Sequence, residues 1–399
     1  MRILYVLRTL DPAWGGPVEG HRRMSEAVMT CKNCDLSIEI ACSDEPNTDW
    51  HSKWQFPVHA LGAGGLGKYG YNAKLWRWLN AEITRFDVVV ISSIWLFHSF
   101  AARAAAIKAK VPYILYVHGA LDPWFKKHYP VKHLKKALYW KLIEARVFRD
   151  AAAVVFTTEE ERLLARNAYH PYVCKERVIS YGTASPPDTA TNEPQQQFRR
   201  AVKGLGESPY LLYLGRLHEK KGIDLLLKSF EVQLPLAETH LVIAGPGESH
   251  ALQRDARASI AADRIHFIGP VYSDKKWAAL RGADALVLPS HAENFGISVA
   301  EALGCGVPVL ISNKVNIWRE VQSTGAGFIN NDDLAGTTRS LGQWASLSPD
   351  AKSKMRSAAR LCFEQHFDIQ RGAHELLSLL GAITRRFPVT PRIVSTTSE

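Results

Sequence analysis

Two glutamates lie eight positions apart in the stretch PSHAENFGISVAEALGCGVPV, which covers residues 289–309. Glu293 stands just before a glycine at position 296, and Glu301 falls in the apolar, helix-like run that follows. Carboxylates accept hydrogen bonds from paired hydroxyls, and the first amides of a helix have no intrahelical partners. The stretch therefore predicts a site for a ligand with two sets of hydroxyls, such as a sugar and a ribose joined by two phosphates. A helix cap at Glu293 and a solvated Glu301 are the alternative.

A second stretch, YLLYLGRLHEKKG (residues 210–222), adds two cations. Arg216 can hold phosphate oxygens in a bidentate fork, and Lys221 can add a compact positive charge, so that the two neutralise a pyrophosphate without a metal ion. Either cation alone is typical of an ordinary protein surface. Together with the two glutamates, they indicate a binding site for a diphosphate.

The elements around these residues follow the pattern of parallel sheets. Short apolar runs alternate with helical stretches in both halves of the chain. We expect strands at RILYVL, DVVVIS, YILYVH and AAVVFTT in the first half, and at LLYLG, HLVIAG, IHFIG, ALVLP and PVLIS in the second. Ligands of such sheets bind beyond the carboxyl ends of the strands, and both stretches above extend directly past a predicted strand.

The length of 399 residues suits two domains, each a doubly wound α/β unit. Residues 183–197 are rich in Pro, Thr, Asn and Gln without apolar periodicity, which is typical of a linker. The predicted organisation is a first domain over residues 1–183, a linker over 184–206, a second domain over 207–366 and a C-terminal segment over 367–399.

The composition excludes several classes of protein. No apolar run approaches the roughly 18 residues that a membrane-spanning helix needs, and the first strand is too short for a signal peptide, so we expect a cytoplasmic protein. The six cysteines follow no disulfide framework. Cys31 and Cys34 form a lone C-x-x-C pair, which fits reduced thiols at a helix end better than a zinc or redox site.

Much of the net charge of +10 lies in residues 126–149, which hold eight Lys or Arg and one acid, Glu144. The apolar residues of this stretch recur at helical spacing, at Leu134, Ala137, Leu138, Leu142, Ala145 and Phe148. The pattern predicts a basic amphipathic helix, which is either the solvated face of a surface helix or a surface that binds anionic lipid. No recognition motif accompanies the charge, so we expect no nucleic-acid partner.

The two stretches that open this section read as G-R-L-x-x-x-K-G and E-x-F-G-x-x-x-x-E-A-x-x-x-G-x-P-V, and they resemble the retaining glycosyltransferases of family 4. The resemblance covers most of the chain. It implies the GT-B fold, an α/β architecture in which two doubly wound Rossmann-like domains face a cleft. It also implies that a C-terminal helix, beginning near residues 367–369, crosses back to the first domain.

The resemblance implies roles for residues of the second domain. Arg216 and Lys221 would hold the diphosphate of a nucleotide sugar, and Glu301 would hold the ribose hydroxyls. Glu293 would meet hydroxyls of the transferred sugar, helped by the amides of Asn294, Phe295 and Gly296. Breaking a glycosyl-phosphate bond creates a charged diphosphate, so stabilising this leaving group is the main catalytic task, which Arg216 and Lys221 can perform.

In the first domain, the resemblance implies that His118 and the loop of Gly15 and Gly16 close the site, with His118 bound to the sugar or a phosphate. A purely structural His118 at a strand end is the alternative. Residues 269–274 would lie near the base. No general base is assigned, because the diphosphate oxygen is thought to assist the acceptor in such enzymes. No two aspartates lie two positions apart, so neither a metal nor another cofactor is expected.

The stretch that begins at His118 is most similar to the family members that build bacterial surface polysaccharides. It implies transfer of a hexose from a nucleotide-diphosphate sugar to a saccharide or lipid-linked saccharide. Residues 126–149 would then bind an anionic membrane surface and place the protein peripherally on the inner face of the cytoplasmic membrane. Two rival functions are a nucleotide-sugar epimerase of the same fold and a non-catalytic sugar-binding protein.

Overall fold

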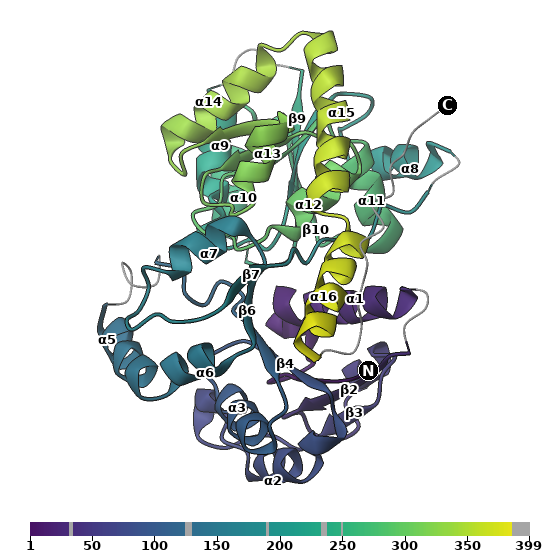
Figure 1. Ribbon diagram of the computed structural model, residues 1–399. Coiled ribbons are helices and arrows are strands. Elements are labelled where there is room, and N and C mark those ends of the chain that lie inside the picture. Colours follow the sequence, from purple (N-terminus) through teal and green to yellow (C-terminus); the bar gives the residue numbers. More distant parts are fainter. Residues whose placement is uncertain (32–34, 124–129, 189–190, 233–237, 249, 385–399) are drawn as a thin grey trace. The chain divides into compact units, whose positions relative to one another are not determined.

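The computed structural model describes residues 1–31, 35–123, 130–188, 191–232, 238–248 and 250–384 of the chain (Figure 1). The chain forms two compact units. Unit 1 comprises residues 1–157, residues 161–181 and the C-terminal part from Ile369 onward. Unit 2 comprises residues 158–160 and 182–368.

Unit 1 is built on a sheet of seven parallel strands in the order β3-β2-β1-β4-β5-β6-β7. The strands are β1 (Arg2–Val6), β2 (Ser37–Cys42), β3 (Val58–Ala60), β4 (Val88–Ser92), β5 (Tyr113–Tyr116), β6 (Ala153–Phe156) and β7 (Glu176–Val178). The four strands predicted in this half are confirmed, and β2, β3 and β7 are additional. The strand order reverses between β1 and β4, so ligands are expected beyond the carboxyl ends of these two strands.

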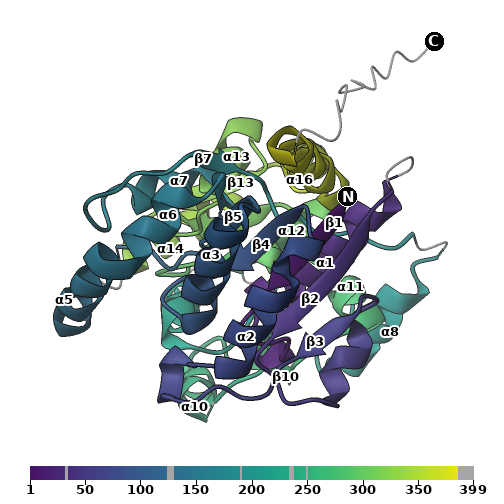
Figure 2. The same cartoon turned by 60° about the horizontal axis from the view of Figure 1, so that its bottom comes forward.

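Helices cover both faces of this sheet, as a doubly wound unit requires. They are α1 (Gly16–Thr30), α2 (Ala73–Glu82), α3 (Phe97–Ala109), α5 (Pro130–Tyr139), α6 (Ala145–Asp150), α7 (Glu159–Ala165) and α16 (Ile369–Thr384), with a π-helical turn at Trp140–Glu144. The C-terminal helix α16 packs against α1 (Figures 1 and 2). Gly372 allows the close approach, because a Cβ atom there would lie 3.0 Å from Met24 Cε of α1 and 2.3 Å from the carbonyl oxygen of Ser180.

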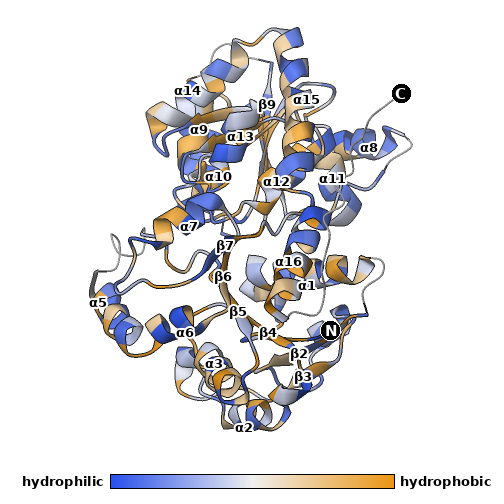
Figure 3. Cartoon of the chain, in the orientation of Figure 1, coloured by the Kyte–Doolittle hydropathy of each residue, from blue (hydrophilic) through white to orange (hydrophobic). Residues whose placement is uncertain are grey.

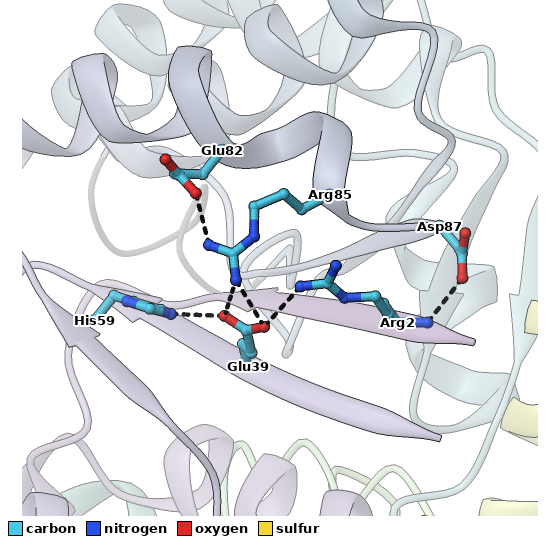
Figure 4. A network of polar contacts seen from close by, with 6 residues as sticks. All are labelled: Arg2, Glu39, His59, Glu82, Arg85 and Asp87. Carbon is cyan, nitrogen blue, oxygen red and sulfur yellow. Dashed lines mark hydrogen bonds and ion pairs between the residues drawn. The ribbon is translucent and has the colours of Figure 1, made fainter. Parts of the chain in front are cut away.

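A polar network ties the first strands of unit 1 together (Figure 4). The carboxylate of Glu39 on β2 accepts hydrogen bonds from Arg2 of β1 (3.2 Å), His59 of β3 (2.8 Å) and Arg85 (3.3 Å). Burial raises the pKa of Glu39, but the hydrogen bonds from His59 and Arg2 and the charge of Arg85 outweigh burial and hold it below its ordinary value. The network explains how β2, a strand that the apolar pattern did not predict, accommodates the charged residue Glu39.

Unit 2 is built on a six-stranded parallel sheet in the order β10-β9-β8-β11-β12-β13. Its strands are β8 (Tyr210–Leu214), β9 (His240–Ala244), β10 (Ile265–Gly269), β11 (Ala285–Leu288), β12 (Val309–Ser312) and β13 (Gly327–Asn330). All five strands predicted in this half are confirmed, and β13 is additional. Figure 3 shows the hydrophobic colouring that such central strands share, since side chains on both faces are buried.

The helices of unit 2 are α8 (Glu193–Ala201), α9 (Ile223–Glu231), α10 (His250–Ala258), α11 (Ser273–Arg281), α12 (Ile297–Gly304), α13 (Trp318–Thr324), α14 (Leu334–Ala345) and α15 (Pro349–His366). Helix α8 falls within residues 184–206, where a linker was expected. Its Phe198 is buried, with its ring 6.1 Å from that of Tyr210 between centroids, and Val202 and Leu205 continue the contact. Three apolar residues among many polar ones suffice to anchor the segment on unit 2.

Candidate functional site

The loops after β8 and β11 are neighbours, because the strand order of the second sheet reverses between these two strands. Gly222 ends the first loop in a left-handed conformation (φ +65°), and a Cβ atom there would lie 2.2 Å from the carbonyl oxygen of Pro289. The carbonyl of Lys220 accepts hydrogen bonds from the N–H of His291 (2.7 Å) and from Ser290 Oγ (2.9 Å). This close approach, which only glycine permits, brings the side chains of the two loops together.

Lys221 and Glu293 form an ion pair across these loops, with side chains that are 16% and 23% exposed. The backbone of Glu293 is fixed on both sides. Its N–H donates to the carbonyl of Lys314 (2.9 Å), and its carbonyl accepts from the N–H of Asn316 (2.9 Å). The sequence predicted that Lys221 binds a diphosphate and that Glu293 binds a sugar. The structure shows in addition that the two side chains neutralise each other.

Arg216 lies on the same edge of the sheet, two residues beyond β8. Its backbone carbonyl accepts a hydrogen bond from Tyr213 Oη (2.8 Å), which fixes the start of the loop. Its guanidinium is exposed and has no ion pair within the part of the chain that the structure describes. Gly245, after the adjacent strand β9, lies so close that a Cβ atom would meet the carbonyl oxygen of Gly215 at 1.8 Å. The loop of Arg216 therefore has a fixed backbone and a side chain accessible to a ligand.

Glu301 lies within α12 and is 3% exposed. Its Oε1 pairs with Lys276 Nζ of α11 at 2.6 Å, and the same ammonium lies 4.2 Å from the ring centroid of Trp277. A buried carboxylate requires such a partner, because an isolated buried charge is strongly unfavourable. Sequence reasoning missed Lys276, since no spacing relates a residue of one helix to its neighbour on another.

The N-terminus of α12 begins after Gly296, which takes a left-handed conformation (φ +75°) as the N-cap residue. The first amides of this eight-residue helix have no intrahelical acceptor and point toward the ligand side of the sheet. The side chain of Phe295 packs in the core, edge-on to Phe367 at 5.8 Å between ring centroids, so Phe295 can offer a ligand only its backbone. Asn294 is half-buried between Glu293 and this core residue.

The segment expected near the base follows β10. Gly269 takes a left-handed conformation (φ +70°), and the space beside its Cα is open to at least 4 Å. The register of β10 against β9 shifts between Phe267 and Gly269, which turns the chain at this point. Tyr272 follows with a ring that is 69% exposed, and it was not singled out from the sequence. An exposed aromatic ring beside open space offers a stacking surface for a flat ligand group.

In unit 1, His118 lies at the carboxyl end of β5 in a left-handed conformation (φ +56°). The N–H of the next residue, Gly119, donates to the carboxylate of Glu161 (2.5 Å), which is buried and also accepts the N–H of Thr157 (2.7 Å). The carboxylate of Glu161, a residue of α7, thereby fixes the turn formed by His118 and Gly119. The positive φ of a non-glycine residue is costly and is retained where surrounding contacts over-determine it.

The imidazole of His118 is held by three side chains. Its Nε2 lies 3.1 Å from His21 Nε2 of α1 and 3.1 Å from Ser92 Oγ. The ring of Tyr181 stacks on the imidazole, with its Oη 3.1 Å from Nδ1 and 3.2 Å from Nε2. Burial lowers the pKa of His118 to about 3, and it lowers the pKa of His21 well below the ordinary value. His118 is therefore neutral at neutral pH, and it can exchange hydrogen bonds with a ligand but cannot supply a positive charge to a phosphate. Sequence analysis did not identify His21.

Gly15 and Gly16 lie where the loop after β1 enters α1. Gly15 is the N-cap residue with φ +84° and ψ −144°, and Gly16 is the first residue of the helix. A Cβ atom on Gly15 would meet nothing within 4 Å. The position therefore requires glycine for its conformation, and it leaves open space beside the first turn of α1.

One group of side chains in the described ranges has the composition of a metal site, namely Cys42, Asp44 and His51. The carboxylate of Asp44 already accepts hydrogen bonds from the hydroxyl of Thr9 and from the N–H of Leu10 (2.7 Å). These donors fix the loop after β1. Trp50 Nε1 (3.3 Å) and His51 Nε2 (3.4 Å) also approach the carboxylate, so protein groups already surround it. We assign the cluster to the folding of this loop.

Helix α5, the π-helical turn and α6 cover residues 130–149 of the basic stretch seen in the sequence, and residues 126–129 lie outside the described ranges. Leu134, Leu138 and Leu142 are 73%, 62% and 54% exposed, so three of the apolar residues at helical spacing face outward. Figure 3 shows both hydrophilic and hydrophobic colours on α5. Lys136 instead turns inward, with its ammonium 4.7 Å from the ring centroid of Trp95. We call Lys132, Leu134, Lys135, Leu138, Lys141 and Leu142 the basic apolar face; all six are exposed.

Two family models match the chain. Residues 20–182 match the glycosyl transferase 4-like domain, and residues 195–341 match the glycosyl transferases group 1. An uncharacterized glycosyltransferase of Methanocaldococcus jannaschii is 24% identical over 280 residues, which are 66% of this chain and 68% of that protein. The D-inositol 3-phosphate glycosyltransferase of Streptomyces scabiei is 32% identical over 229 residues, 54% of this chain and 51% of that protein. The chain thus spans about half the length of the latter relative.

Solved structures resemble the whole chain. The structure of Anabaena HepE in complex with UDP-glucose matches with a TM-score of 0.74 at 15% identity, covering 96% of this chain and 100% of that one. A glycosyltransferase from Rickettsia africae matches with a TM-score of 0.74 at 16% identity, covering 97% and 99%. At this level of identity the likeness establishes the fold alone. None of the helices in the described ranges combines the length and the hydrophobicity that a membrane-spanning helix requires.

Proposed function

This chain belongs to the family 4 glycosyltransferases and has the GT-B fold, and we propose that it transfers a hexose, with retention of configuration, from a nucleotide-diphosphate sugar. The proposed acceptor is a saccharide or lipid-linked saccharide in bacterial polysaccharide biosynthesis. One observation carries the proposal. The loops that meet where the order of the second sheet reverses bring Arg216, Lys221 and Glu293 to the N-terminus of α12.

The ion pair of Lys221 and Glu293 supports a specific way of binding the donor. A diphosphate that approaches Arg216 competes with the carboxylate of Glu293 for the ammonium of Lys221. Once Lys221 has moved to the phosphates, Glu293 is free to accept hydrogen bonds from hydroxyls of the donor sugar. The pair therefore keeps both charged groups partnered until the donor separates them.

Glu301 keeps a different partner. Its ion pair with Lys276 holds the carboxylate on one side of α12, and the carboxylate is the proposed acceptor of hydrogen bonds from the two ribose hydroxyls. Arg216, Lys221 and the amides of α12 then stabilise the charge that develops on the leaving diphosphate. The acceptor hydroxyl attacks from the face that the diphosphate leaves, and a diphosphate oxygen takes its proton, so the mechanism needs no protein base. No step requires a metal or another cofactor.

The first test is donor binding. UDP-glucose is the first candidate, because HepE binds it, and GDP-, ADP-, TDP- and CMP-sugars complete the panel. At 100 times its Kd a ligand stabilises the folded protein by about 2.7 kcal/mol, which a thermal shift in excess EDTA detects. We expect one nucleotide class to give the shift. A protein that shifts with no nucleotide sugar, with or without Mg²⁺, or that converts the donor to a free altered sugar without an acceptor, is not the proposed transferase.

The basic apolar face supports a membrane-bound acceptor. Its leucines can enter the acyl boundary while its lysines lie at anionic headgroups, and each lysine near such a surface contributes about 1 kcal/mol. A protein held in this way on the inner face of the cytoplasmic membrane meets lipid-linked saccharides directly. We therefore propose a cytoplasmic enzyme that binds the membrane peripherally through residues 130–142.

Replacing Lys132, Lys135 and Lys141 with Glu tests this placement. Lys136 is left intact because it packs on Trp95. We expect binding to phosphatidylcholine vesicles that contain phosphatidylglycerol to fall at least about 100-fold, since three favourable charges are reversed, while nucleotide binding stays unchanged. Ile107→Ser is the control, because Ile107 is 48% exposed and is followed by Lys108 but lies on α3. Equal vesicle binding by the triple variant would refute the membrane role of this face.

A further inference from the structure

Arg8 follows the first strand of unit 1, and no part of the proposed reaction uses it. Its backbone carbonyl accepts a hydrogen bond from the N–H of Ser43 (3.2 Å), so the chain continues the line of β1 beyond Val6. The strand order reverses beside β1, where ligands of doubly wound sheets bind. The side chain of Arg8 is half-buried and forms no ion pair or hydrogen bond within the described ranges. A permanently charged guanidinium therefore stands unpaired at the ligand end of the sheet.

The acids on the loops after β1 and β2 bind other groups. Asp11 and Asp44 accept hydrogen bonds from N–H groups of the loop after β1 (2.8 and 2.7 Å), and Glu45 accepts one from the loop after β3 (2.9 Å). Burial and, to a smaller extent, the charge of Arg8 lower the pKa of His98 to about 4, so this neighbour is neutral. Partly buried charges are normally paired, and no acid in the described part of the chain pairs with Arg8.

A glycine-rich loop over residues 62–70 covers one edge of the guanidinium. Gly70 has a left-handed conformation (φ +69°), and a Cβ atom there would lie 2.0 Å from Nη1 of Arg8. The N–H of Gly65 donates to the carbonyl of Tyr71 (2.7 Å), which closes the loop on itself. Nη1 is buried and has no hydrogen-bond partner among the described residues. The loop thus packs on the guanidinium without supplying an acceptor.

The other edge of the guanidinium is available to a ligand. Nε and Nη2 of Arg8 keep some exposure to solvent, and neither has a partner in the part of the chain that the structure describes. These two nitrogens form a fork that can hold two oxygens of a carboxylate or a phosphate. The next residue after Gly70 is Tyr71, which is 46% exposed, with its ring edge-on to that of Phe97 (4.7 Å between centroids). An exposed aromatic ring can pack on a sugar, so the arrangement suits a saccharide with an anionic group.

We propose that Arg8 is the centre of an anion-binding site in unit 1, which takes the phosphate or carboxylate group of a saccharide at Nε and Nη2. The bound group supplies the missing negative charge, while the glycine-rich loop holds the guanidinium from the other edge. The inference rests on the proposed function in one respect. Because Arg216 and Lys221 of unit 2 are assigned to the donor diphosphate, the anionic saccharide at Arg8 is the acceptor.

The test measures hydrogen exchange of peptides from residues 62–72 in the full-length protein by mass spectrometry. The probes are glucose 6-phosphate, glucuronate and the neutral methyl glucoside, at constant ionic strength. Arg8→Met removes the charge and keeps a long unbranched side chain, and Arg8→Lys keeps the charge without the fork. Arg77→Met is the control, because Arg77 is an exposed cation on α2 without an ion pair in the described ranges. Peptides from residues 215–222 report binding of the same probes to unit 2.

We expect one or both anionic probes to protect residues 62–72 in the wild type and in Arg77→Met, and methyl glucoside to give no protection. The probe that binds more tightly distinguishes a phosphorylated saccharide from a uronate. Its apparent Kd should rise at least about 10-fold in Arg8→Met and less in Arg8→Lys. Without a probe, the Tm of Arg8→Met should equal or exceed that of the wild type, because the variant no longer buries an unpaired charge.

The proposal would be overturned if neither anion protected residues 62–72 in the wild type, if protection were equal in Arg8→Met, or if methyl glucoside protected as well as the anions. An Arg8→Met protein that melts below the wild type or does not fold would show that the guanidinium supports the fold, which would also overturn the proposal.

These readouts separate the inference from the proposed function. If Arg8→Met weakens binding of a nucleotide sugar as much as binding of the probes, Arg8 serves the donor, and the inference fails while the transferase stands. Conversely, a protein that binds no nucleotide sugar but shows protection that depends on Arg8 loses the proposed function and keeps the anion site.

Discussion

In both units the candidate residues lie near the carboxyl ends of the strands of a parallel sheet. Neutral hydrogen-bonding groups surround them in unit 1, and charged groups in ion pairs surround them in unit 2. In unit 1, His118 and His21 are neutral imidazoles whose pKa values burial lowers. In unit 2, the carboxylates of Glu293 and Glu301 each form an ion pair with a lysine. Buried polar groups need partners, and both arrangements supply them to the candidate residues, although Nδ1 of His21 has no hydrogen-bond partner among the described residues. Unit 1 does so with hydrogen bonds between neutral groups and unit 2 does so with ion pairs.

The difference indicates how the two units divide the work. Charged groups that can change partners suit a ligand with two negative phosphates, so unit 2 has the properties of a donor site. Neutral groups fixed in one orientation suit uncharged hydroxyls, such as those of the sugar or the acceptor. Removing charges from unit 2 should therefore affect binding and leaving-group stabilisation, whereas changes in unit 1 should affect orientation and stability.

The largest expected effect comes from the cations of unit 2. Lys221→Ala and Arg216→Ala should each lower kcat/KM by about 10²–10³, because one group that stabilises the developing charge of the diphosphate is lost. Lys228→Ala is the control, since Lys228 is an exposed cation on the adjacent helix α9. Steady-state kinetics with the donor identified above measure the effect. Losses of similar size in the control would show that net charge, and not the site, determines the rate.

Glu293→Gln sharpens the contrast within the site. The variant loses the charge that competes for Lys221, so nucleoside diphosphate should bind as tightly as to the wild type or more tightly. The neutral amide is a poorer acceptor for the sugar hydroxyls, so kcat should fall about 10- to 100-fold. Calorimetric titration and turnover assays separate the two effects. Weaker nucleotide binding with unchanged kcat would show that Glu293 serves the nucleotide and not the sugar.

Apolar runs predicted nine of the strands and both sheets, because central parallel strands are buried on both faces. They missed β2, β3, β7 and β13, which are short, lie toward the edges or carry polar residues such as Glu39. The helix α8 was missed because Phe198 is its only buried side chain, with Val202 and Leu205 adding contacts just beyond the helix. Local periodicity records burial along one element and says little about weakly apolar segments that tertiary contacts stabilise.

The residues of the candidate site likewise fall into those that the sequence predicted and those that it did not. Arg216, Lys221, Glu293 and Glu301 were predictable, because each lies within or just beyond a loop that follows a strand and their types suit one ligand. Lys276 and His21 were not, since each contacts its partner, Glu301 or His118, on another element. For His21 one signal existed. It lies three residues from Val18 and three from Met24, which places a histidine on the buried stripe of a helix.

The stability of unit 1 should depend on pH through two buried groups whose pKa values shift in opposite directions. Burial raises the pKa of Glu144 in unit 1 to about 7, and its Oε2 has no hydrogen-bond partner among the described residues. Its raised pKa contributes stability that is full below its ordinary pKa and is lost as the pH rises through about 7. The lowered pKa of His118 acts in the other direction, with stability full above its ordinary value and lost as the pH falls toward about 3.

Glu144→Gln isolates the first of these effects. The neutral amide removes the cost of burying a carboxylate, so unit 1 should gain about 3 kcal/mol above pH 7 and little below pH 5. Hydrogen exchange of unit 1 peptides, measured by mass spectrometry at pH 5 and pH 8, reads this gain. Peptides of unit 2 provide the internal control. Equal protection of unit 1 in both proteins at pH 8 would show that Glu144 is not a buried charge.

The smallest expected effect tests the glycine at the ligand edge of unit 1. Gly15→Ala should cost about 1 kcal/mol in stability, because alanine disfavours a positive φ, and no atom lies within 4 Å to add a clash. If the open space beside Gly15 receives the substrate, the methyl group also lowers kcat/KM about 10-fold. Gly325→Ala is the control for a positive φ in open space, since Gly325 (φ +68°, ψ +26°) ends α13 with no atom within 4 Å of an added Cβ, although it lies in the αL region and Gly15 does not. Equal kcat/KM in both variants would mean that Gly15 shapes the chain and that the substrate lies elsewhere.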